Sequence, residues 1–224
     1  MAKIKKPKTG GAKAGKAPVR VRRDPQRTRA RILEAARIEF ARSGLGGARV
    51  DQITARAGSN KRMIYYYFGD KEALFLATLE SAYEQIRRAE QSLKLTDLAP
   101  AAGMRRLVRF TWEYYLAHPE FITLLNSENL HRARHLKQSG EIRALHSPLV
   151  AMLEDLLARG QRAGVFRRGV DAVQLYISIA ALGYFYLSNN HTLSTIFGRD
   201  LMRPQALRQR LAHMTEIVLG YLSK

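Results

Sequence analysis

The fold is decided by the stretch RVDQITARAGSNKRMIYYYFGDK, residues 49–71. Its first half predicts a short helix with one apolar face, formed by Val50, Ile53 and Ala57. Gly58 follows directly and can adopt the left-handed conformation that ends a helix. Ser59 or Asn60 can then cap a second helix by accepting hydrogen bonds from its free backbone N–H groups. Two short helices joined by a glycine turn are typical of the helix-turn-helix, whose second helix enters the major groove of DNA.

The second helix carries side chains that can read base edges. We expect its outer face to be formed by Lys61, Arg62, Met63, Tyr65 and Tyr66. Ile64 and Phe68 are left to pack inward. The two cationic side chains can donate to guanine O6 and N7, whereas the methionine and the tyrosines can contact a thymine methyl group. The alternative is that the aromatic residues belong mostly to the core and that the basic residues form a solvated face.

These residues also carry a family resemblance. AGSNKRMIYYYFGDKEALF closely resembles the end of the DNA-binding domain of TetR-type (tetracycline-repressor-like) transcription regulators, whose pattern is roughly A-G-V-S-x-x-x-L-Y-x-Y-F-x-x-K-E-x-L. The similarity covers residues 27–79. It implies an all-α fold, with an N-terminal three-helix helix-turn-helix DNA-binding domain and a C-terminal helical domain for ligand binding and dimerisation. It also implies that Lys71 contacts a DNA phosphate.

The full set of expected DNA-binding residues is Arg49, Asn60, Lys61, Arg62, Met63, Tyr65, Tyr66, Tyr67 and Lys71. Cationic donors and helix N-termini can hold the phosphates. Three positions depart from the family pattern. Arg62 stands where the family usually has a small residue, and Met63 stands where it has threonine or serine. Asp51 replaces a polar or basic residue, so it either reads cytosine N4 or faces water.

The charge of the chain indicates a polyanionic partner. Its 224 residues carry a formal net charge of +19, which favours DNA first and RNA or an anionic membrane second. The absence of cysteine excludes disulfides and thiolate chemistry. The N-terminus lacks the apolar region of a signal peptide. The most apolar run, residues 172–187, is shorter than the ~20 residues that span a bilayer. We therefore expect a cytoplasmic, nucleoid-associated protein without membrane contact.

Three segments are expected along the chain. Residues 1–23 predict a disordered basic arm, because they lack the apolar content to offset the entropy of ordering. Nine of the 38 basic residues lie there and all 19 acidic residues follow, so the remainder still carries +10. The arm either enters a DNA groove or is a solvated tail that raises affinity without specificity. Residues 24–70 are expected to form the DNA-binding domain and residues 71–224 the effector-binding and dimerisation domain.

Helices are expected throughout. The first begins at Asp24-Pro25 and ends at Ser43-Gly44. The others span residues 71–94, 104–118, 119–125, 141–163, 171–188 and 205–221. The last two helices each carry an apolar stripe, and by resemblance these stripes form a four-helix bundle across a two-fold axis. The stripes are Leu175, Ile179, Leu182 and Tyr186, then Leu207, Leu211, Met214, Val218 and Leu222. The alternative is that both stripes are buried within one subunit.

The body between head and dimer helices is expected to hold a pocket for a small-molecule effector. Aromatic side chains with a few polar groups are the usual lining of such a site. Weak candidates are Trp112, Tyr115, Phe121, Asn126, Asn129, Tyr176 and Tyr184. Residue by residue, an aromatic side chain at helical spacing is more often part of the core.

One further cluster has metal-ligand spacing. His131 and His135 lie four residues apart on an expected helix, with Glu128 one turn before them. Two arginines between the histidines oppose a cation, so we predict no metal and no cofactor. Neither a nucleophile elbow nor a glycine-rich phosphate loop occurs. The chain is therefore not expected to be an enzyme.

The function predicted from the sequence is a ligand-responsive, dimeric DNA-binding transcriptional regulator. In this family such a protein is most often a repressor that a small-molecule effector releases from a palindromic operator. The residues are equally compatible with an activator. The alternative is an architectural or nonspecific DNA-binding protein, and a third class is a metal-dependent enzyme that uses Glu128, His131 and His135.

Overall fold

The computed structural model describes residues 24–223, apart from the side chains of Arg143, Leu145, His146 and Ser147. The predicted basic arm, residues 1–23, lies outside the described residues. Within them all regular secondary structure is helical, which confirms the expected all-α fold. No helix in residues 24–223 combines the length and apolarity needed to cross a bilayer.

The N-terminal head consists of α1 (Pro25–Gly47), α2 (Val50–Ala57) and α3 (Lys61–Phe68). The Asp24 carboxylate caps α1 by accepting from the backbone N–H of Gln26 at 2.9 Å. Gly58 is left-handed, with φ 56°, and Asn60 caps α3 by accepting from the Met63 backbone N–H at 3.1 Å. The head core contains Ile32, Phe40, Ile53 and Ile64. The predicted helix-turn-helix is therefore present with the expected turn and cap.

Helix α1 breaks where its end was expected. Gly44 has φ 63° and ψ 177°, outside the helical region, and one further turn continues to Gly47. A positive φ favours glycine because it has no Cβ to clash with the backbone. The break directs the backbone N–H of Leu45 toward α6 (Pro119–Leu130), where it donates to Ser127 Oγ at 3.4 Å.

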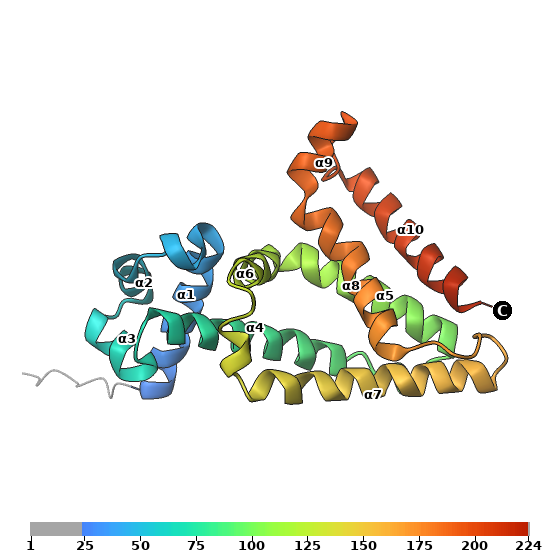
Figure 1. Cartoon of the computed structure of the whole chain (residues 1–224), viewed down its shortest axis with the longest axis horizontal. Helices are drawn as coiled ribbons and strands as arrows, with labels where there is room; N and C mark the ends of the chain where they lie inside the picture. The colour runs from blue at the N-terminus through green and yellow to red at the C-terminus, as the bar shows by residue number, and fades with distance from the viewer. Residues whose placement is uncertain (1–23, 224) are drawn as a thin grey trace, which may run out of the picture.

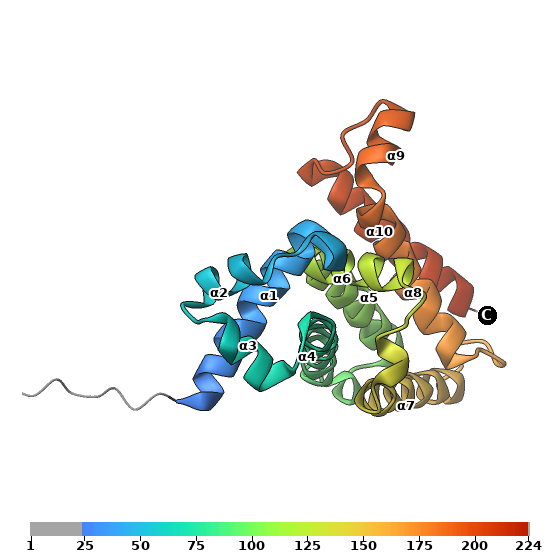
Figure 2. The ribbon, with the colours of Figure 1, turned by 60° about the vertical axis from the view of Figure 1, so that its left-hand side comes forward.

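A single helix, α4 (Lys71–Gln91), runs from the head into the body (Figure 1). The body then contains η1 (Leu95–Asp97), α5 (Pro100–Ala117), α6, η2 (Leu136–Gln138) and α7 (Glu141–Arg162). It ends with α8 (Ala172–Ser188), α9 (Asn190–Phe197) and α10 (Pro204–Leu222). Figure 2 shows α8, α9 and α10 rising on the side of the molecule away from the head. Both views place α6 beside α1, so the body touches the head at two helices, α4 and α6.

Several helix boundaries differ from those expected. Helix α5 begins at Pro100 rather than Met104, because proline fits the first turn, where no backbone N–H is needed. Helix α6 continues past Leu125 to Leu130, so the polar residues Asn126 and Glu128 are helical. Helix α9 was not expected, although Leu193, Ile196 and Phe197 in NHTLSTIF have helical spacing; the segment is only eight residues long.

The apolar stripes assigned to the dimer are core residues of one subunit, and that prediction is wrong. Leu175, Ile179, Met214, Val218 and Leu222 are at most 2% exposed, and the remaining members pack against the core. A different row faces outward at a spacing of four residues on α8 and α10. It contains Val173, Ile177, Phe185, Ile217 and Tyr221, each 41–58% exposed. This outward row is hereafter the α8–α10 apolar face.

The body core encloses an ion pair. Arg87 and Glu90, both on α4, are 3% and 2% exposed, and Arg87 Nη1 lies 2.8 Å from Glu90 Oε2. Arg87 Nη2 also donates to the Tyr176 hydroxyl on α8 at 2.9 Å. Burial raises the pKa of Glu90 to about 7, against the lowering effect of Arg87. The cost of removing this carboxylate from water therefore exceeds the attraction of its partner.

We predict that Glu90→Gln removes a pH dependence of stability. The unfolded chain releases the Glu90 proton near its ordinary pKa of 4.5, whereas the folded protein keeps it to about pH 7. The contribution of this group to stability is thus fully present below pH 4.5 and is lost as the pH rises through 7, by roughly 3 kcal/mol in total. Urea unfolding of the full chain across this range measures it.

The control for this measurement is Glu84→Gln, on the same helix, where the glutamate side chain is 46% exposed beside Arg88. We expect the Glu84 variant to retain the wild-type slope of stability against pH. Equal slopes in the wild type and the Glu90 variant would show that Glu90 ionises normally in the folded protein.

Candidate nucleic-acid interface and effector site

The reading face of α3 is formed by residues on two successive turns. Lys61, Arg62, Tyr65 and Tyr66 are exposed, and the two tyrosines are 53% and 76% exposed. Arg62 makes no hydrogen bond or ion pair with the described part of the chain. Exposed tyrosine rings beside exposed cationic side chains suit contact with base edges and thymine methyl groups.

Two members of the expected set lie elsewhere on α3. Met63 and Tyr67 are partly buried and pack against the core, so the expectation that Met63 lies on the outer face is wrong. Both line a groove of about 660 Å³ between the start of α1 and α3, together with Arg27 and Arg31. Two cationic side chains that could contact a phosphate backbone thus border the groove, and the Asp24 carboxylate borders it too.

The expected phosphate anchors surround α3. Arg49 is exposed at the N-cap position of α2. Lys71 is half-buried at the start of α4, and its ammonium group donates to the carbonyl oxygen of Ala48 at 3.2 Å. The Asn60 side-chain oxygen caps α3, so only the amide N–H groups of Asn60 remain to donate to a phosphate. Lys71 therefore ties α4 to the loop before α2, besides any contact with DNA.

Asp51 meets Lys61 across the turn. The carboxylate on α2 and the ammonium on α3 are 2.8 Å apart, and both side chains are more than half exposed. The hydrogen bond that Lys61 donates to the Asp51 carboxylate raises the pKa of Lys61. Of the two roles considered for Asp51, the structure shows the side chain exposed to water, and reading of cytosine stays a prediction. The structure also shows this acidic side chain holding one of the expected readers in place.

The effector candidates do not all line one site, and their contacts differ. Tyr115 and Phe121 are buried with stacked rings 6.0 Å apart, and Tyr176 binds Arg87. Trp112 packs on Tyr186. Asn126 and Tyr184 hydrogen-bond to each other. Asn129 is exposed and bonds the carbonyl oxygen of Leu125.

One cleft of about 300 Å³ lies between α5, α6 and the end of α8. Two of the expected effector residues line it, Tyr115 and Asn126. Its other polar side chains, which the sequence did not single out, belong to Thr123, Ser188, Asn190 and His191. We call this space the α5–α6–α8 cleft.

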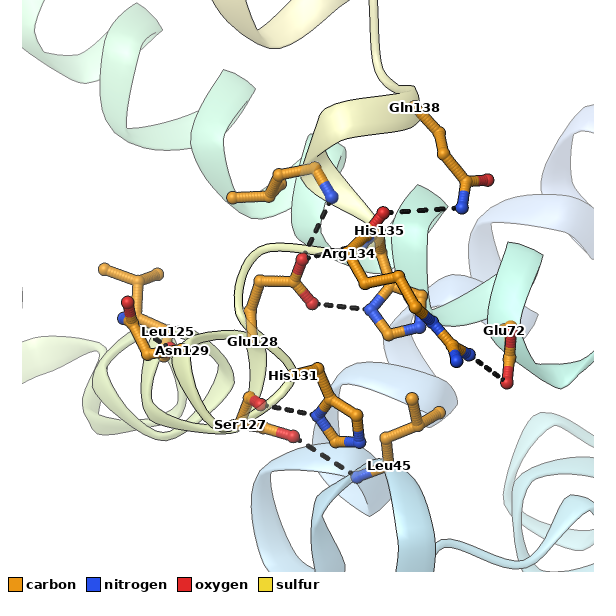
Figure 3. Close-up of polar contacts among 11 residues, drawn as sticks. Leu45, Glu72, Leu125, Ser127, Glu128, Asn129, His131, Arg134, His135 and Gln138 are labelled. Carbon is orange, nitrogen blue, oxygen red and sulfur yellow. Dashed lines mark hydrogen bonds and ion pairs between the residues drawn. The ribbon is translucent and has the colours of Figure 1, made fainter.

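The cluster with metal-ligand spacing has a structural role. Glu128 is buried, and its carboxylate accepts from the backbone N–H groups of His135 and Leu136, both at 2.9 Å, and from His135 Nδ1 at 2.6 Å (Figure 3). The histidines do not lie on a helix as expected. They belong to a tight turn in which Arg132 and Ala133 have φ near 55°. Within residues 24–223 no group of three potential metal ligands is assembled.

The turn held by Glu128 fastens the body to the head. The His135 ring packs edge-on against Phe75 of α4, with ring centroids 5.2 Å apart. Arg134 pairs with Glu72 at 2.6 Å, and Ser139 donates to Glu80 at 2.6 Å, so three side chains of the segment reach α4. On the other side, Glu120 of α6 pairs with Arg37 of α1. We call α6 with residues 131–139 the head–body joint.

Comparisons with known proteins agree with this architecture. Residues 32–78 match bacterial regulatory proteins of the tetR family, and residues 100–218 match the tetracyclin repressor-like C-terminal domain. The chain is 43% identical to the HTH-type transcriptional repressor NicS of Pseudomonas putida over 198 residues, 88% of this chain and 93% of that protein. The chain belongs to the TetR family. It is therefore a DNA-binding transcriptional regulator, in a family of regulators rather than enzymes.

Other TetR proteins are similar at lower identity. The HTH-type transcriptional repressor SCO4008 of Streptomyces coelicolor is 35% identical over 166 residues, which cover 71% of this chain and 78% of that protein. The crystal structure of the transcriptional regulator SCO4942 from the same species superposes with a TM-score of 0.63 at 26% identity. It covers 87% of this chain and 98% of that one.

We predict that Asp51→Asn strengthens binding to all DNA sequences. The change removes one negative charge from the reading face of this TetR protein and frees Lys61. We expect about 2- to 5-fold tighter binding at low salt, with the gain shrinking as salt rises. Fluorescence anisotropy on two unrelated duplexes measures it.

The matched control is Glu113→Gln, an exposed acid on α5, which makes the same charge change away from α3. Its binding should equal that of the wild type. If Asp51→Asn instead weakened binding only to duplexes with a cytosine at one position, Asp51 would be a base reader.

Proposed function

We propose that this protein is a dimeric repressor that binds a palindromic operator and that a small-molecule effector releases from it. The observation that carries the proposal is the exposed face of α3 on a rigid three-helix head, where Arg62, Tyr65 and Tyr66 point to solvent beside Lys61, which pairs with Asp51. The names of NicS and SCO4008 as repressors support repression rather than activation. Such a protein works in the cytoplasm, at the nucleoid.

Sequence-specific binding requires that the readers be held rigidly. Ile64 is fully buried, Asn60 caps α3, and Arg31 donates to the carbonyl oxygen of Gly58 at 2.8 Å. The reading helix is thus fixed at its start, along its length and through the turn before it. A fixed helix places side chains at base edges with little loss of entropy, which favours site-specific readout over general attraction to phosphate.

Dimerisation is supported by the α8–α10 apolar face. An exposed apolar row along two adjacent helices costs free energy in water and is typical of an interaction surface. A second copy of the same face packed on it would form a four-helix interface with two-fold symmetry. Two heads would then meet half-sites one DNA turn apart, ~34–36 Å.

Effector control is supported by the α5–α6–α8 cleft and by the head–body joint. The cleft has a volume of about 300 Å³, at the small end of the range for ligand sites. It borders α6, which contacts α1 of the head. A ligand that binds better when α6 and α4 hold the heads at the wrong spacing would shift the population away from DNA.

Selection of bound sequences from random duplexes at moderate salt tests DNA recognition. We expect a palindromic consensus in the wild type. Arg62→Ala should relax the preference at one position in each half-site by ~1–3 kcal/mol, because one bidentate base contact is lost.

Arg106→Ala is the control for Arg62, since it removes the same charge from an exposed site on α5. Its consensus should be unchanged. A smooth loss of binding with salt and no consensus would instead identify an architectural, nonspecific DNA-binding protein.

We predict that Ile177→Glu produces a monomer. The residue lies in the middle of the α8–α10 apolar face and is 51% exposed. A two-fold interface would bury two of the new carboxylates. The dissociation constant of the dimer should therefore rise at least about 100-fold. Analytical ultracentrifugation measures the change.

Leu130→Glu is the matched control, because Leu130 is 84% exposed on α6, outside this face. We expect it to remain dimeric. A monomeric wild type, or an unaffected Ile177 variant, would show that the α8–α10 apolar face is not the dimer interface.

A further inference from the structure

The lining of the α5–α6–α8 cleft includes two ionisable side chains, Tyr115 and His191. None of its residues is aspartate, glutamate, lysine or arginine. Burial raises the pKa of Tyr115, which is therefore neutral at physiological pH. One wall is apolar, formed by Leu116, Ile122 and Leu187. A charged ligand would lose its hydration here without meeting a carboxylate, ammonium or guanidinium group, so the lining favours an uncharged molecule.

The polar wall is organised by one amide. Asn126 Nδ2 donates to Ser188 Oγ at 3.0 Å, and Asn126 Oδ1 accepts from the Tyr184 hydroxyl. Both partners lie on α8. The amide presents a donor and an acceptor side by side, so a ligand with the complementary pair can replace both bonds at once. Amides and lactams carry this pair.

Asn126 is the first of three consecutive residues that bond to three different parts of the molecule. Asn126 bonds to α8, Ser127 accepts from Leu45 of α1, and Glu128 holds the turn that packs on α4. Successive residues of an α-helix point about 100° apart. A shift of α6 at this point therefore changes all three contacts together.

We propose that the α5–α6–α8 cleft binds an uncharged small molecule through an amide-type donor–acceptor pair on Asn126, and that Ser127 passes this event to the head. The inference rests on the function proposed above and specifies its effector class. The Leu45–Ser127 bond links this part of α6 to α1, besides the Glu120–Arg37 pair at the start of α6. The Leu45–Ser127 bond lies beside the break in α1, where that helix has no continuous helical backbone to resist a displacement.

A matched series of ligands tests the effector class. Benzamide, benzoate and benzylamine share one phenyl ring and are neutral, anionic and cationic at neutral pH. Calorimetric titration into the full chain should show benzamide binding with a Kd of about 1–10 mM, and both charged probes at least about 5-fold weaker. Tighter binding of either charged probe, or no benzamide binding in this range, would show that the effector is not an uncharged amide.

Asn126→Asp provides a test that loss of folding cannot mimic. The change keeps the size of the side chain but replaces its N–H donor with a negative charge. The preference should switch from benzamide to benzylamine. An unchanged preference would place the probe elsewhere on the protein.

Ser127→Ala tests the link to the head. In the wild type, saturating benzamide should weaken binding to the selected consensus duplex by about 5-fold or more. The Ser127 variant should bind benzamide with the wild-type Kd, yet lose most of this effect on DNA. Ser92→Ala removes the same hydroxyl from the end of α4 and should behave as the wild type. A full response in the Ser127 variant would overturn the link.

The two proposals fail in distinguishable ways. A wild-type chain that binds a consensus duplex but does not respond to benzamide retains the proposed DNA-binding function and loses this effector class. A chain with no consensus loses the proposed function itself, whatever its binding of benzamide.

Discussion

The relation between head and body depends on one buried carboxylate. Glu128 sits in an interior that would expel an isolated charge, and it is stabilised there by three donors. Two of these donors are backbone N–H groups in a turn whose central residues, Arg132 and Ala133, have positive φ. Such a turn costs free energy in residues other than glycine, so the carboxylate is what keeps the segment in this shape. With the turn fixed, Arg134 and Ser139 reach α4, and the body gains its hold on the helix that leaves the head.

The head could be predicted from the sequence because its determinants are local. Gly58 ends α2 through its own left-handed backbone conformation, and Asn60 caps α3 through a bond within the first turn of that helix. The apolar spacing of each short helix identifies its buried side. The joint could not be predicted in this way. Glu128, His131 and His135 have a spacing typical of a metal-binding helix, and only the two left-handed residues between the histidines turn that spacing into a cap for the backbone. Nothing in the sequence HRARH marks those residues as left-handed.

The helices of the body show a second limit of periodicity. Helix α8 is apolar on nearly all sides, so several stripes satisfy the same helical spacing. The stripe at Leu175 and Ile179 and the row at Val173 and Ile177 differ by a rotation of the helix. Packing against the neighbouring helices α5, α6, α7 and α10 decides which is buried. Met63 was misplaced for the same reason, because it packs partly against the core and lines the groove between α3 and the start of α1. Tertiary packing, rather than sequence pattern, selects the exposed face.

Helix α4 links these features, because it carries contacts of both kinds. Near the head, Glu72, Phe75 and Glu80 receive the segment that Glu128 shapes. Farther along, Arg87 and Glu90 are buried in the body, and Arg87 is hydrogen-bonded to Tyr176 of α8. A rigid helix held by directional polar contacts at both ends cannot follow a change at one end while keeping all contacts at the other. The polar groups buried along α4 cost stability, as the raised pKa of Glu90 indicates. In return, these buried polar contacts restrict α4, which carries the DNA-binding head, to a few defined positions.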